Sequence, residues 1–565
     1  MIFLSILAFI FGIGLIILVH EAGHFYFAKR AGILCHEFSI GFGPAIWKKK
    51  YGETTVVIRC IPIGGYVAMA DSTLEELMIS KGDTIGINLE EGFVKELILD
   101  TTMDSEITGV VERIDLLGKH GEQLEVELEV EGEIKTYPVA SDATMIASPK
   151  DKQQITPYER SFESKSIKHR AFTMGAGVVM NFILAIAIYL IISFITGVPN
   201  LESSAIGEVS KGLPAEKLGL KAGDEIKAIK YGDNDFKDIN TWTEFSSSLG
   251  EMAQSGYTEL TLKYVRDGKE YTTDSTQTYF EAQNIGITNV EIPDKYLNLD
   301  SNPEYGVQIG NMKLKYGTSS KNEMDLAKDE PELTPGDFIT GISVYKYTDD
   351  YNKNPKEFES VNSWSDMVEE LNTLNGDVGY VLFEFYDQET KEIQTSQTPA
   401  YTYSNVLLEG QEIPVYRSYI GVTSSYHFSL FGCISQAFEN FWSSATVIFK
   451  TLKELISPSA SIREVGPSDL SGFVGIFDMV KMTVSAGLLS YLSLLALLSV
   501  NIGIMNLLPI PALDGGRLVF LGYEAITRKK PDKKFETILN NIVMILLLLL
   551  FVYVTYNDII RIFTK

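Results

Sequence analysis

Long apolar runs and polar segments alternate along the 565 residues of the chain. Four runs, at about 2–27, 171–197, 485–508 and 538–556, are apolar enough to cross a bilayer, which takes roughly 20 helical residues. The first has no basic residue ahead of its apolar core and no small-residue cleavage site behind it. It therefore reads as a retained span rather than a signal peptide. The pattern predicts a multi-pass α-helical membrane protein with four spans.

Two segments between the first and second spans have the pattern of strands. Residues 38–69 are short apolar stretches broken by Gly, Pro and a basic turn, which predicts a membrane-associated β-hairpin. In residues 71–150, nineteen acidic residues face six basic ones, and "EQLEVELEVEGEIKTYPV" alternates charged and apolar positions. This predicts a β-rich cytoplasmic insertion. An acidic, solvated module without chemistry of its own is the simpler interpretation of it.

The region between the second and third spans contains an internal duplication. "LGLKAGDEIKAIK" (218–230) is echoed by "PELTPGDFITGIS" (331–343), and "TWTEFSSSL" (241–249) by "SWSDMVEEL" (363–371). A strand pair follows each copy, so we expect two domains in tandem. The first copy, through "GLPAEKLGLKAGDEI", resembles a PDZ domain, and the repeated order extends this resemblance to the second. PDZ domains bind extended peptides at a sheet edge.

A further helix is expected just before the third span. In 428–456, large apolar residues recur at three- and four-residue steps, which is typical of an amphipathic helix. Glu439 and Lys450 make it a poor span. Two placements stay open: the outer membrane surface, or packing against the PDZ-like domains. The expected parts of the chain are then 1–70 (first span and hairpin), 71–160 (insertion), 161–200 (second span), 201–295 and 296–425 (PDZ-like domains), 426–480 (amphipathic helix and linker) and 481–565 (third and fourth spans).

Charge gives these parts an orientation. The net charge of −26 argues against a nucleic-acid partner, whose phosphates need Lys and Arg. Lys and Arg cluster between the first and second spans and again between the third and fourth, so both loops are expected in the cytoplasm. The duplicated region should then lie outside the cell membrane. Three cysteines without a CxxC pair imply neither a disulfide framework nor a cysteine zinc site.

The end of the first span carries ionisable residues in the motif "VHEAGHF". His20 and His24 are four residues apart and share one helix face, so both imidazoles can bind one metal ion, and imidazoles suit zinc. Glu21 lies about 100° around the helix, where it can act as a base instead of a ligand. Satisfied histidines are common in soluble cores, but ionisable groups within a membrane are functional by default.

A third ligand is expected at the opposite end of the chain. A catalytic zinc needs three protein ligands and an open position. "MNLLPIPALDGGR" (505–517) ends the third span, and Asp514 within it is a second carboxylate at membrane depth. The charge pattern places this motif and the histidines at the same membrane face, although about 490 residues separate them.

Together, "HEAGH" and "NLLPIPALDGG" resemble the site-2 protease family of intramembrane zinc metalloproteases, in particular the bacterial regulator-of-sigma-factor proteases. The resemblance implies a Zn²⁺ cofactor bound by His20, His24 and Asp514, and Glu21 as the catalytic base. It implies that Asn506 orients a substrate strand. "GVVMNF" (177–182) is similar to the family's Gly-x-x-x-Asn segment and assigns Asn181 to substrate binding, although Val178 replaces the usual proline.

The expected function is hydrolysis of peptide bonds within or near the transmembrane helices of single-span membrane proteins, such as anti-sigma factors or remnant signal peptides. Partners would be these substrates, the membrane lipid and an upstream site-1 protease acting on the same substrate. The active site would lie near the cytoplasmic face. Two rivals are a non-catalytic adaptor that presents PDZ domains, which has no need of Glu21, and a metal transporter, for which four spans with one ligand cluster offer no evident path.

Overall fold

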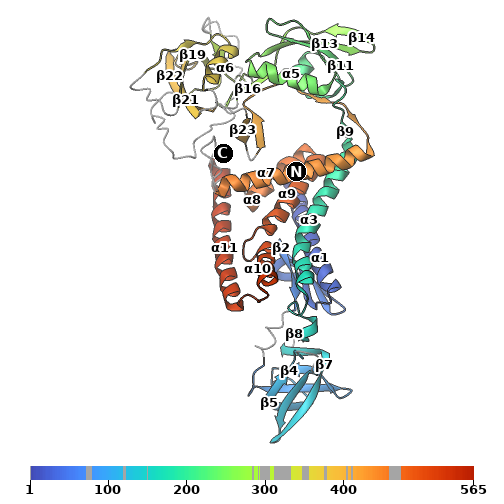
Figure 1. Cartoon of the computed structure of the whole chain (residues 1–565). Coiled ribbons are helices and arrows are strands. Elements are labelled where there is room, and N and C mark those ends of the chain that lie inside the picture. The colour runs from blue at the N-terminus through green and yellow to red at the C-terminus, as the bar shows by residue number, and fades with distance from the viewer. Residues whose placement is uncertain are drawn as a thin grey trace. The chain divides into compact units, whose positions relative to one another are not determined.

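The computed structural model describes residues 2–70, 79–118, 123–148, 151–282, 285–289, 292, 306–310, 333–346, 355–374, 378–401, 405–408, 411–456 and 472–564. The chain forms two compact units, each with its own core (Figure 1). The first unit comprises Met1–Ile192, Ala437–Ala445 and Ser471–Lys565, and the second comprises Ser193–Gln436 and Thr446–Leu470.

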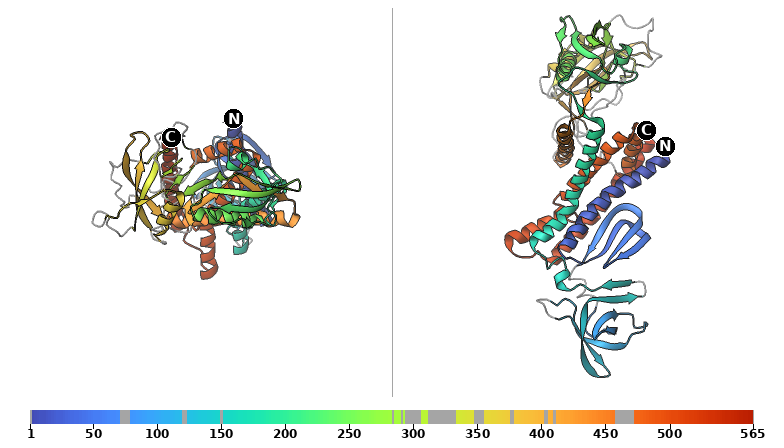
Figure 2. Two further views of the ribbon diagram at one scale, coloured as in Figure 1. Left: turned by 90° about the horizontal axis from the view of Figure 1, so that it is seen from above. Right: turned by 90° about the vertical axis from the view of Figure 1, so that its right-hand side faces the viewer.

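The four expected spans are helices. Among the described residues, four helices are long and apolar enough to cross a membrane, which confirms a multi-pass membrane protein. They are α1 (Ile2–Arg30), α3 (Ile167–Thr196), α9 (Leu488–Leu507) and α11 (Lys533–Thr564). Helices α1 and α3 run side by side (Figure 2). Glycine makes this approach possible, because a Cβ at Gly23 would lie 2.7 Å from the carbonyl oxygen of Ala176.

Two further helices join the bundle. α7 (Leu430–Ile456) is the expected amphipathic helix, and Phe431, Phe438 and Trp442 along it are exposed. α8 (Phe473–Ala486) was not expected, and it precedes α9 directly. The first turn of α8 is capped from α11, because Asp558 Oδ2 accepts hydrogen bonds of 2.9 Å from the backbone of Gly472 and Gly475. This cap joins elements that are distant in sequence, which explains why local pattern did not reveal it.

The segment after α1 is an antiparallel hairpin of β1 (Cys35–Tyr51) and β2 (Thr54–Met69), and it lies against α1 (Figure 2). Glu53 in its turn accepts hydrogen bonds from Arg160 (2.8 Å) and Lys29 (2.5 Å). The Arg160 hydrogen bond, with that of Lys29, outweighs partial burial and lowers the pKa of Glu53 to about 2. The ionised carboxylate therefore ties the hairpin turn to the end of α1 and to the short 3₁₀ helix η1 (Tyr158–Arg160).

The insertion is β-rich. Its six-stranded sheet has the order β4-β3-β5-β6-β7-β8, and it closes on itself because β4 also pairs with β7 in parallel. Alternate side chains of these strands point inward and form a separate apolar core. The strands are β3 (Thr84–Glu90), β4 (Phe93–Ile98), β5 (Ile107–Asp115), β6 (Glu125–Val130), β7 (Glu133–Ser148) and β8 (Asp151–Gln154).

The second unit contains two lobes with the duplicated order of elements. The first lobe has β10 (Ile206–Val209), α4 (Pro214–Lys217), β11 (Glu225–Tyr231), β12 (Lys237–Asp238), α5 (Trp242–Gln254), β13 (Glu259–Arg266), β14 (Lys269–Thr272) and β15 (Thr276–Gln277). The second has β16 (Tyr279–Ala282), β17 (Ile287–Thr288), β18 (Val307–Gln308), β19 (Phe338–Lys346), β20 (Glu359–Ser360), α6 (Trp364–Asn372), β21 (Val378–Tyr386) and β22 (Ile393–Tyr401). The remaining strands are β9 (Val198–Pro199), β23 (Asn405–Leu408), β24 (Gln411–Pro414), β25 (Tyr416–Tyr419), β26 (Val422–Ser424) and β27 (Tyr426–His427).

The duplication extends to the helix caps. α5 begins with a capping box formed by Thr241 and Glu244, and α6 with one formed by Ser363 and Asp366. In both lobes a short strand and then the helix lie between two antiparallel partners, since β11 pairs with β13 and β19 pairs with β21. The motif echoed in the sequence is therefore repeated in three dimensions.

The two lobes are nested and not simply consecutive. β26 pairs with β10, and Ile420 lies in the core of the first lobe, although the tandem expectation placed both in 296–425. Conversely, Phe280 from the expected range 201–295 lies in the core of the second lobe. These boundaries differ from the expected ones because the closing strand of the first lobe comes from the far side of the second, a long-range pairing that local sequence does not show.

Candidate metal centre

Three potential metal-binding atoms converge where α1 meets the start of α10 (Asp514–Thr527). The Nε2 atoms of His20 and His24 are 3.2 Å apart, and each lies 3.2 Å from Oδ2 of Asp514. In the part of the chain that the structure describes, this is the one cluster of three or more His, Cys, Asp or Glu that could hold a metal ion. The expected ligands from the two ends of the chain are therefore brought together.

The backbone after α9 explains how Asp514 reaches the histidines. α9 ends at Leu507, and Ala512 adopts a φ of +73°, a left-handed conformation that is costly for a residue with a side chain. The chain then turns sharply into α10. Neither position 515 nor position 516 has room for a side chain. A Cβ at Gly515 would lie 2.5 Å from the carbonyl carbon of Leu507, and a Cβ at Gly516 would lie 2.8 Å from Cα of Pro511. The "DGG" sequence is thus a requirement of this turn.

Both imidazoles have a partner for the ring nitrogen that faces away from the cluster. Nδ1 of His24 lies 2.8 Å from the carbonyl oxygen of Thr173, which accepts its proton. Nδ1 of His20 lies 3.2 Å from the Asn181 amide, whose other terminal atom is buried without a hydrogen-bond partner among the described residues. With the amide turned so that its oxygen faces His20, Asn181 accepts the Nδ1 proton, and both Nε2 atoms are free to bind a metal.

Gly177 leaves the space next to Nε2 of His20 and Nε2 of His24 open. A Cβ on Gly177 of α3 would overlap Nε2 of His24 and would lie 2.7 Å from Nε2 of His20. Oδ2 of Asp514 is also buried and accepts no hydrogen bond within the described part of the chain. The cluster thus offers two imidazole nitrogens and one carboxylate oxygen that has no other partner among the described residues, and Gly177 leaves space beside them. This donor set suits a catalytic zinc ion.

A cavity of about 380 Å³ opens onto this cluster. Glu21 and Asn506 line it, together with residues 64–67 of β2, so the hairpin edge forms one wall. Gly65 brings this edge close to α1, since a Cβ there would lie 3.0 Å from Cγ of Glu21. Asn506 therefore lies on the wall of the cavity that holds the metal-binding cluster, and its part in orienting a substrate stays a prediction. Asn181 is fully buried behind His20 and does not line the cavity, so its position differs from that expected of a substrate-binding residue.

The hairpin wall is stiffened by a polar network that the sequence analysis did not foresee. Tyr66, which lines the cavity, donates a hydrogen bond of 2.6 Å to Glu37, and Arg59 donates bonds of 2.6 Å to Glu37 and 3.0 Å to Tyr66. Burial, with the neighbouring Glu37 carboxylate, raises the pKa of Tyr66, so the phenol keeps its proton and its donor role. Residues 37, 59 and 66 lie on paired strands, which only the hairpin register reveals.

Comparison with known proteins shows to which family this site belongs. The model of peptidase family M50 matches residues 8–550. The chain belongs to peptidase family M50. It is 30% identical to the zinc metalloprotease RasP of Oceanobacillus iheyensis over 563 residues, with 99% of each chain covered, and 30% identical to RasP of Shouchella clausii over 566 residues, with 99% of this chain and all of the relative covered. A putative zinc metalloprotease of Staphylococcus aureus is 29% identical over 99% of both chains.

Membership of the M50 family, the site-2 protease family, confirms the resemblance drawn from the two motifs. The protein is a membrane-embedded zinc metalloprotease with Zn²⁺ as its cofactor. Family members act on membrane proteins, so the substrates belong to that class.

Gly177 and Thr173 are site residues that sequence reasoning missed. The Gly-x-x-x-Asn segment was a signal for Gly177, whereas nothing in the sequence points to the Thr173 carbonyl.

Proposed function

We propose that His20, His24 and Asp514 hold the zinc ion, and that Glu21 is the base in the hydrolysis of peptide bonds within or near the transmembrane helices of single-span proteins. The observation that carries this proposal is the convergence of three ligand atoms, 3.2 Å apart, on a helix that is apolar enough to span the membrane. We expect anti-sigma factors or remnant signal peptides, in regulated intramembrane proteolysis, to be its substrates.

The chemistry divides between the metal and the protein. When bound, zinc supplies a Lewis acid that polarises the scissile carbonyl. Glu21, on the cavity wall beside the cluster, takes a proton from the attacking water and returns it to the leaving nitrogen. Asn181 and the Thr173 carbonyl hold the two imidazoles in the tautomer that leaves Nε2 unprotonated. A non-catalytic adaptor that presents PDZ domains would need none of this proton transfer, and Glu21 argues against that rival.

The substrate is bound as an extended strand. The amide groups of a helix are hydrogen-bonded along its own backbone, so a substrate helix must unwind before one of its carbonyls is accessible. The edge of β2 at 64–67 lines the cavity and offers backbone groups to such a strand, while Asn506, which also lines the cavity, orients it. This placement gives the hairpin its function and supports its association with the membrane face.

The position of the cut tests this function. Purified protein and a single-span reporter are reconstituted in lipid vesicles, and the product masses are measured. We expect two fragments whose shared end lies within the reporter's span or close to it, and no fragments when zinc is removed by a chelator. Cuts confined to the reporter's soluble domains would contradict the proposal. A reporter with a span of uninterrupted leucine serves as the control and is expected to be cut more slowly because it resists unwinding.

The orientation that we propose places the loops between α1 and α3 and between α9 and α11 in the cytoplasm. A cysteine at Lys530, in a variant without the three native cysteines, is then shielded from an impermeant thiol reagent in intact cells. One at Lys237, which is also exposed, is labelled. Both become labelled in opened cells, which controls for local accessibility. Labelling of the Lys530 position alone in intact cells would reverse the orientation.

The two lobes of the second unit, which we interpret as PDZ-like domains, then lie outside the cell, and we propose that they act as a size filter. A substrate with a bulky ectodomain is held off, and one already trimmed by a site-1 protease enters. Peptide capture in a PDZ groove is the competing mechanism. The repeated sheets and capping boxes support the PDZ interpretation of both lobes.

Deletion distinguishes the filter from capture. The backbone nitrogen of Asn200 donates a 2.7 Å hydrogen bond to the carbonyl of Ser425, so the chain enters and leaves the lobes at adjacent points. Residues 201–424 can therefore be replaced by a short Gly/Ser linker without moving the flanking chain. Under the filter model the shortened enzyme cuts a reporter with its ectodomain as fast as a trimmed one. An enzyme that still cuts trimmed reporter but spares the untrimmed form would rule out the filter, whereas slower cutting of trimmed reporter supports capture.

A further inference from the structure

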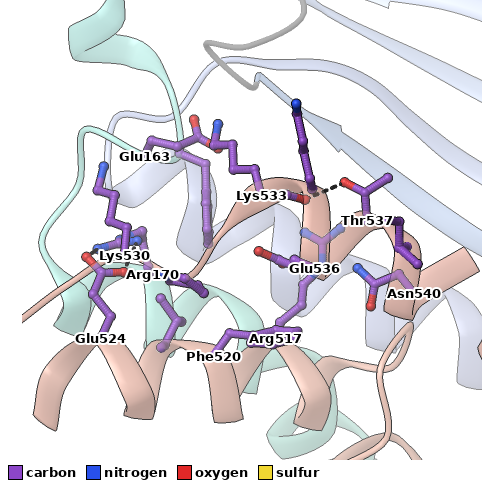
Figure 3. Close-up of a pocket in the computed structure, with 15 residues that line it drawn as sticks. Glu163, Arg170, Arg517, Phe520, Glu524, Lys530, Lys533, Glu536, Thr537 and Asn540 are labelled. Atoms are coloured by element: carbon purple, nitrogen blue, oxygen red, sulfur yellow. Dashed lines mark hydrogen bonds and ion pairs between the residues drawn. The ribbon is translucent and has the colours of Figure 1, made fainter. Parts of the chain in front are cut away.

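A second cavity of the first unit, of about 600 Å³, shares Arg517 of α10 with the metal-centre cavity and is otherwise lined by different residues. Its walls come from the segment before α3, from α10 and from the first turns of α11 (Figure 3). α3 and α11 are candidate membrane spans that begin at Ile167 and Lys533, so in the proposed topology the cavity lies where both helices enter the membrane. This is the depth at which lipid headgroups lie.

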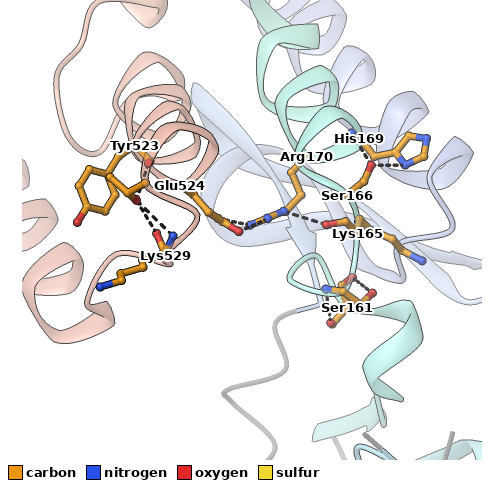
Figure 4. Close-up of polar contacts among 10 residues, drawn as sticks. Ser161, Lys165, Ser166, His169, Arg170, Tyr523, Glu524 and Lys529 are labelled. Carbon is orange, nitrogen blue, oxygen red and sulfur yellow. Dashed lines mark hydrogen bonds and ion pairs between the residues drawn. The ribbon is translucent and has the colours of Figure 1, made fainter. Parts of the chain in front are cut away.

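The floor of the cavity is a closed ion pair. Arg170 donates two hydrogen bonds to Glu524, of 2.9 and 2.7 Å, and both side chains are buried (Figure 4). Arg170 also donates a 3.0 Å bond to the carbonyl of Lys165. The charges of this pair satisfy one another, so the floor is electrically neutral and holds α3 against α10.

The remaining charges of the walls are mainly positive. Arg517 comes from α10, Lys530 from the loop after it and Lys534 from α11, and their side chains make no hydrogen bond or ion pair with any residue that the structure describes. Lys533 adds a fourth cation, and Glu163 and Glu536 are the opposing carboxylates. An excess of positive charge at one site stands out in a chain whose net charge is −26.

The walls are also partly apolar. Phe162, Phe520, Leu521, Pro531 and Ile538 line the cavity beside the cations. The span that begins next to it, Lys533–Ile560, is only 6% buried by protein in its most apolar window, so its surface faces lipid. Cations at headgroup depth, combined with apolar walls that lead onto a lipid-exposed helix, match a phospholipid in both its charged and its hydrocarbon parts.

We propose that this cavity binds the headgroup of an anionic phospholipid, with its phosphate near Arg517, Lys530 and Lys534 and its acyl chains along α11. An acidic peptide would match the cations but not the apolar walls or the adjoining lipid-facing surface. Arg517 also lines the cavity of the metal centre, three residues after Asp514 on α10, so the lipid would contact the helix that carries a proposed zinc ligand. For this reason Arg517 is left unchanged in the test.

The test compares lipid binding to the full-length protein by native mass spectrometry. Phosphatidylglycerol and phosphatidylcholine with identical acyl chains are titrated into wild type, into Lys530→Gln/Lys534→Gln and into Lys168→Gln/Lys529→Gln. The last pair removes the same charge from exposed lysines near the same span ends but outside the cavity. We expect wild type and the Lys168/Lys529 variant to prefer phosphatidylglycerol by about tenfold or more, and the Lys530/Lys534 variant to lose this preference.

Three results would overturn the proposal. The first is that the Lys530/Lys534 variant keeps the preference for phosphatidylglycerol. The second is that the Lys168/Lys529 variant loses this preference equally, which would indicate an effect of general surface charge. The third is that millimolar inorganic phosphate or an acidic peptide displaces phosphatidylglycerol from wild type, which would indicate a site for a soluble ligand. The single variants Lys530→Gln and Lys534→Gln, each expected to lose part of the preference, keep the test decisive if the double variant folds poorly. Binding is measured without proteolysis, so the result is independent of the proposed function.

Discussion

Replacing Gly177 by alanine is expected to weaken zinc binding by more than about 100-fold and to abolish proteolysis, although residue 177 donates nothing to the metal. The added methyl group would overlap Nε2 of His24 and lie 2.7 Å from Nε2 of His20, beside the position that we propose for the ion. Neither imidazole can move aside easily, because the Thr173 carbonyl and the Asn181 amide hold their other nitrogens. The measurement is a competition titration of purified protein against a chromophoric zinc chelator.

Gly175 supplies the matched control. It lies on the same helix, and a Cβ there would have no atom within 4 Å, so Gly175→Ala adds the same methyl group with the same effect on helix propensity. We expect it to bind zinc as wild type does. Wild-type zinc affinity in Gly177→Ala would show that the ion is not held between Nε2 of His20 and Nε2 of His24.

Asn181→Leu, in the same titration, should weaken zinc binding by about 10- to 100-fold, as is typical for loss of a hydrogen-bond partner behind a metal ligand.

The spans and the metal ligands could be predicted because their signals are local. Twenty apolar residues specify a spanning helix wherever they occur, and the four-residue spacing of His20 and His24 fixes a shared face. Asp514 required one more step, the argument that an unpaired carboxylate is costly at membrane depth. The four helices confirm the spans, and the structure brings the three proposed ligands together.

The remaining features depend on contacts that no local pattern encodes. The requirement for glycine at 177 arises from α1 packing against α3, and the cap of α8 by Asp558 arises from α11 returning to it. The pairing of β10 with β26 joins residues about 215 apart and turns two expected tandem domains into nested lobes. Asn181 was assigned by resemblance to substrate binding, whereas the structure buries it beside Nδ1 of His20, a contact between α3 and α1.

Replacing Glu21 by glutamine is expected to lower the rate of cleavage by about 10²- to 10⁴-fold, the usual contribution of a general base. The amide is nearly the same size as the carboxylate, so the packing of Gly65 against Glu21 is preserved. It cannot take a proton from water, however. Because the three proposed ligands are unchanged, the variant should bind one zinc ion with wild-type affinity. Glu159→Gln, which removes a carboxylate outside the metal-centre cavity, is the control and should cleave normally.

Zinc content and cleavage rate, measured on the same preparation of Glu21→Gln, test the central assignment most directly. We expect one zinc ion per chain together with cleavage of the single-span reporter reduced by at least about 100-fold. Glu21→Gln that holds zinc and cuts the reporter at the wild-type rate would contradict it, because the base would then be another residue.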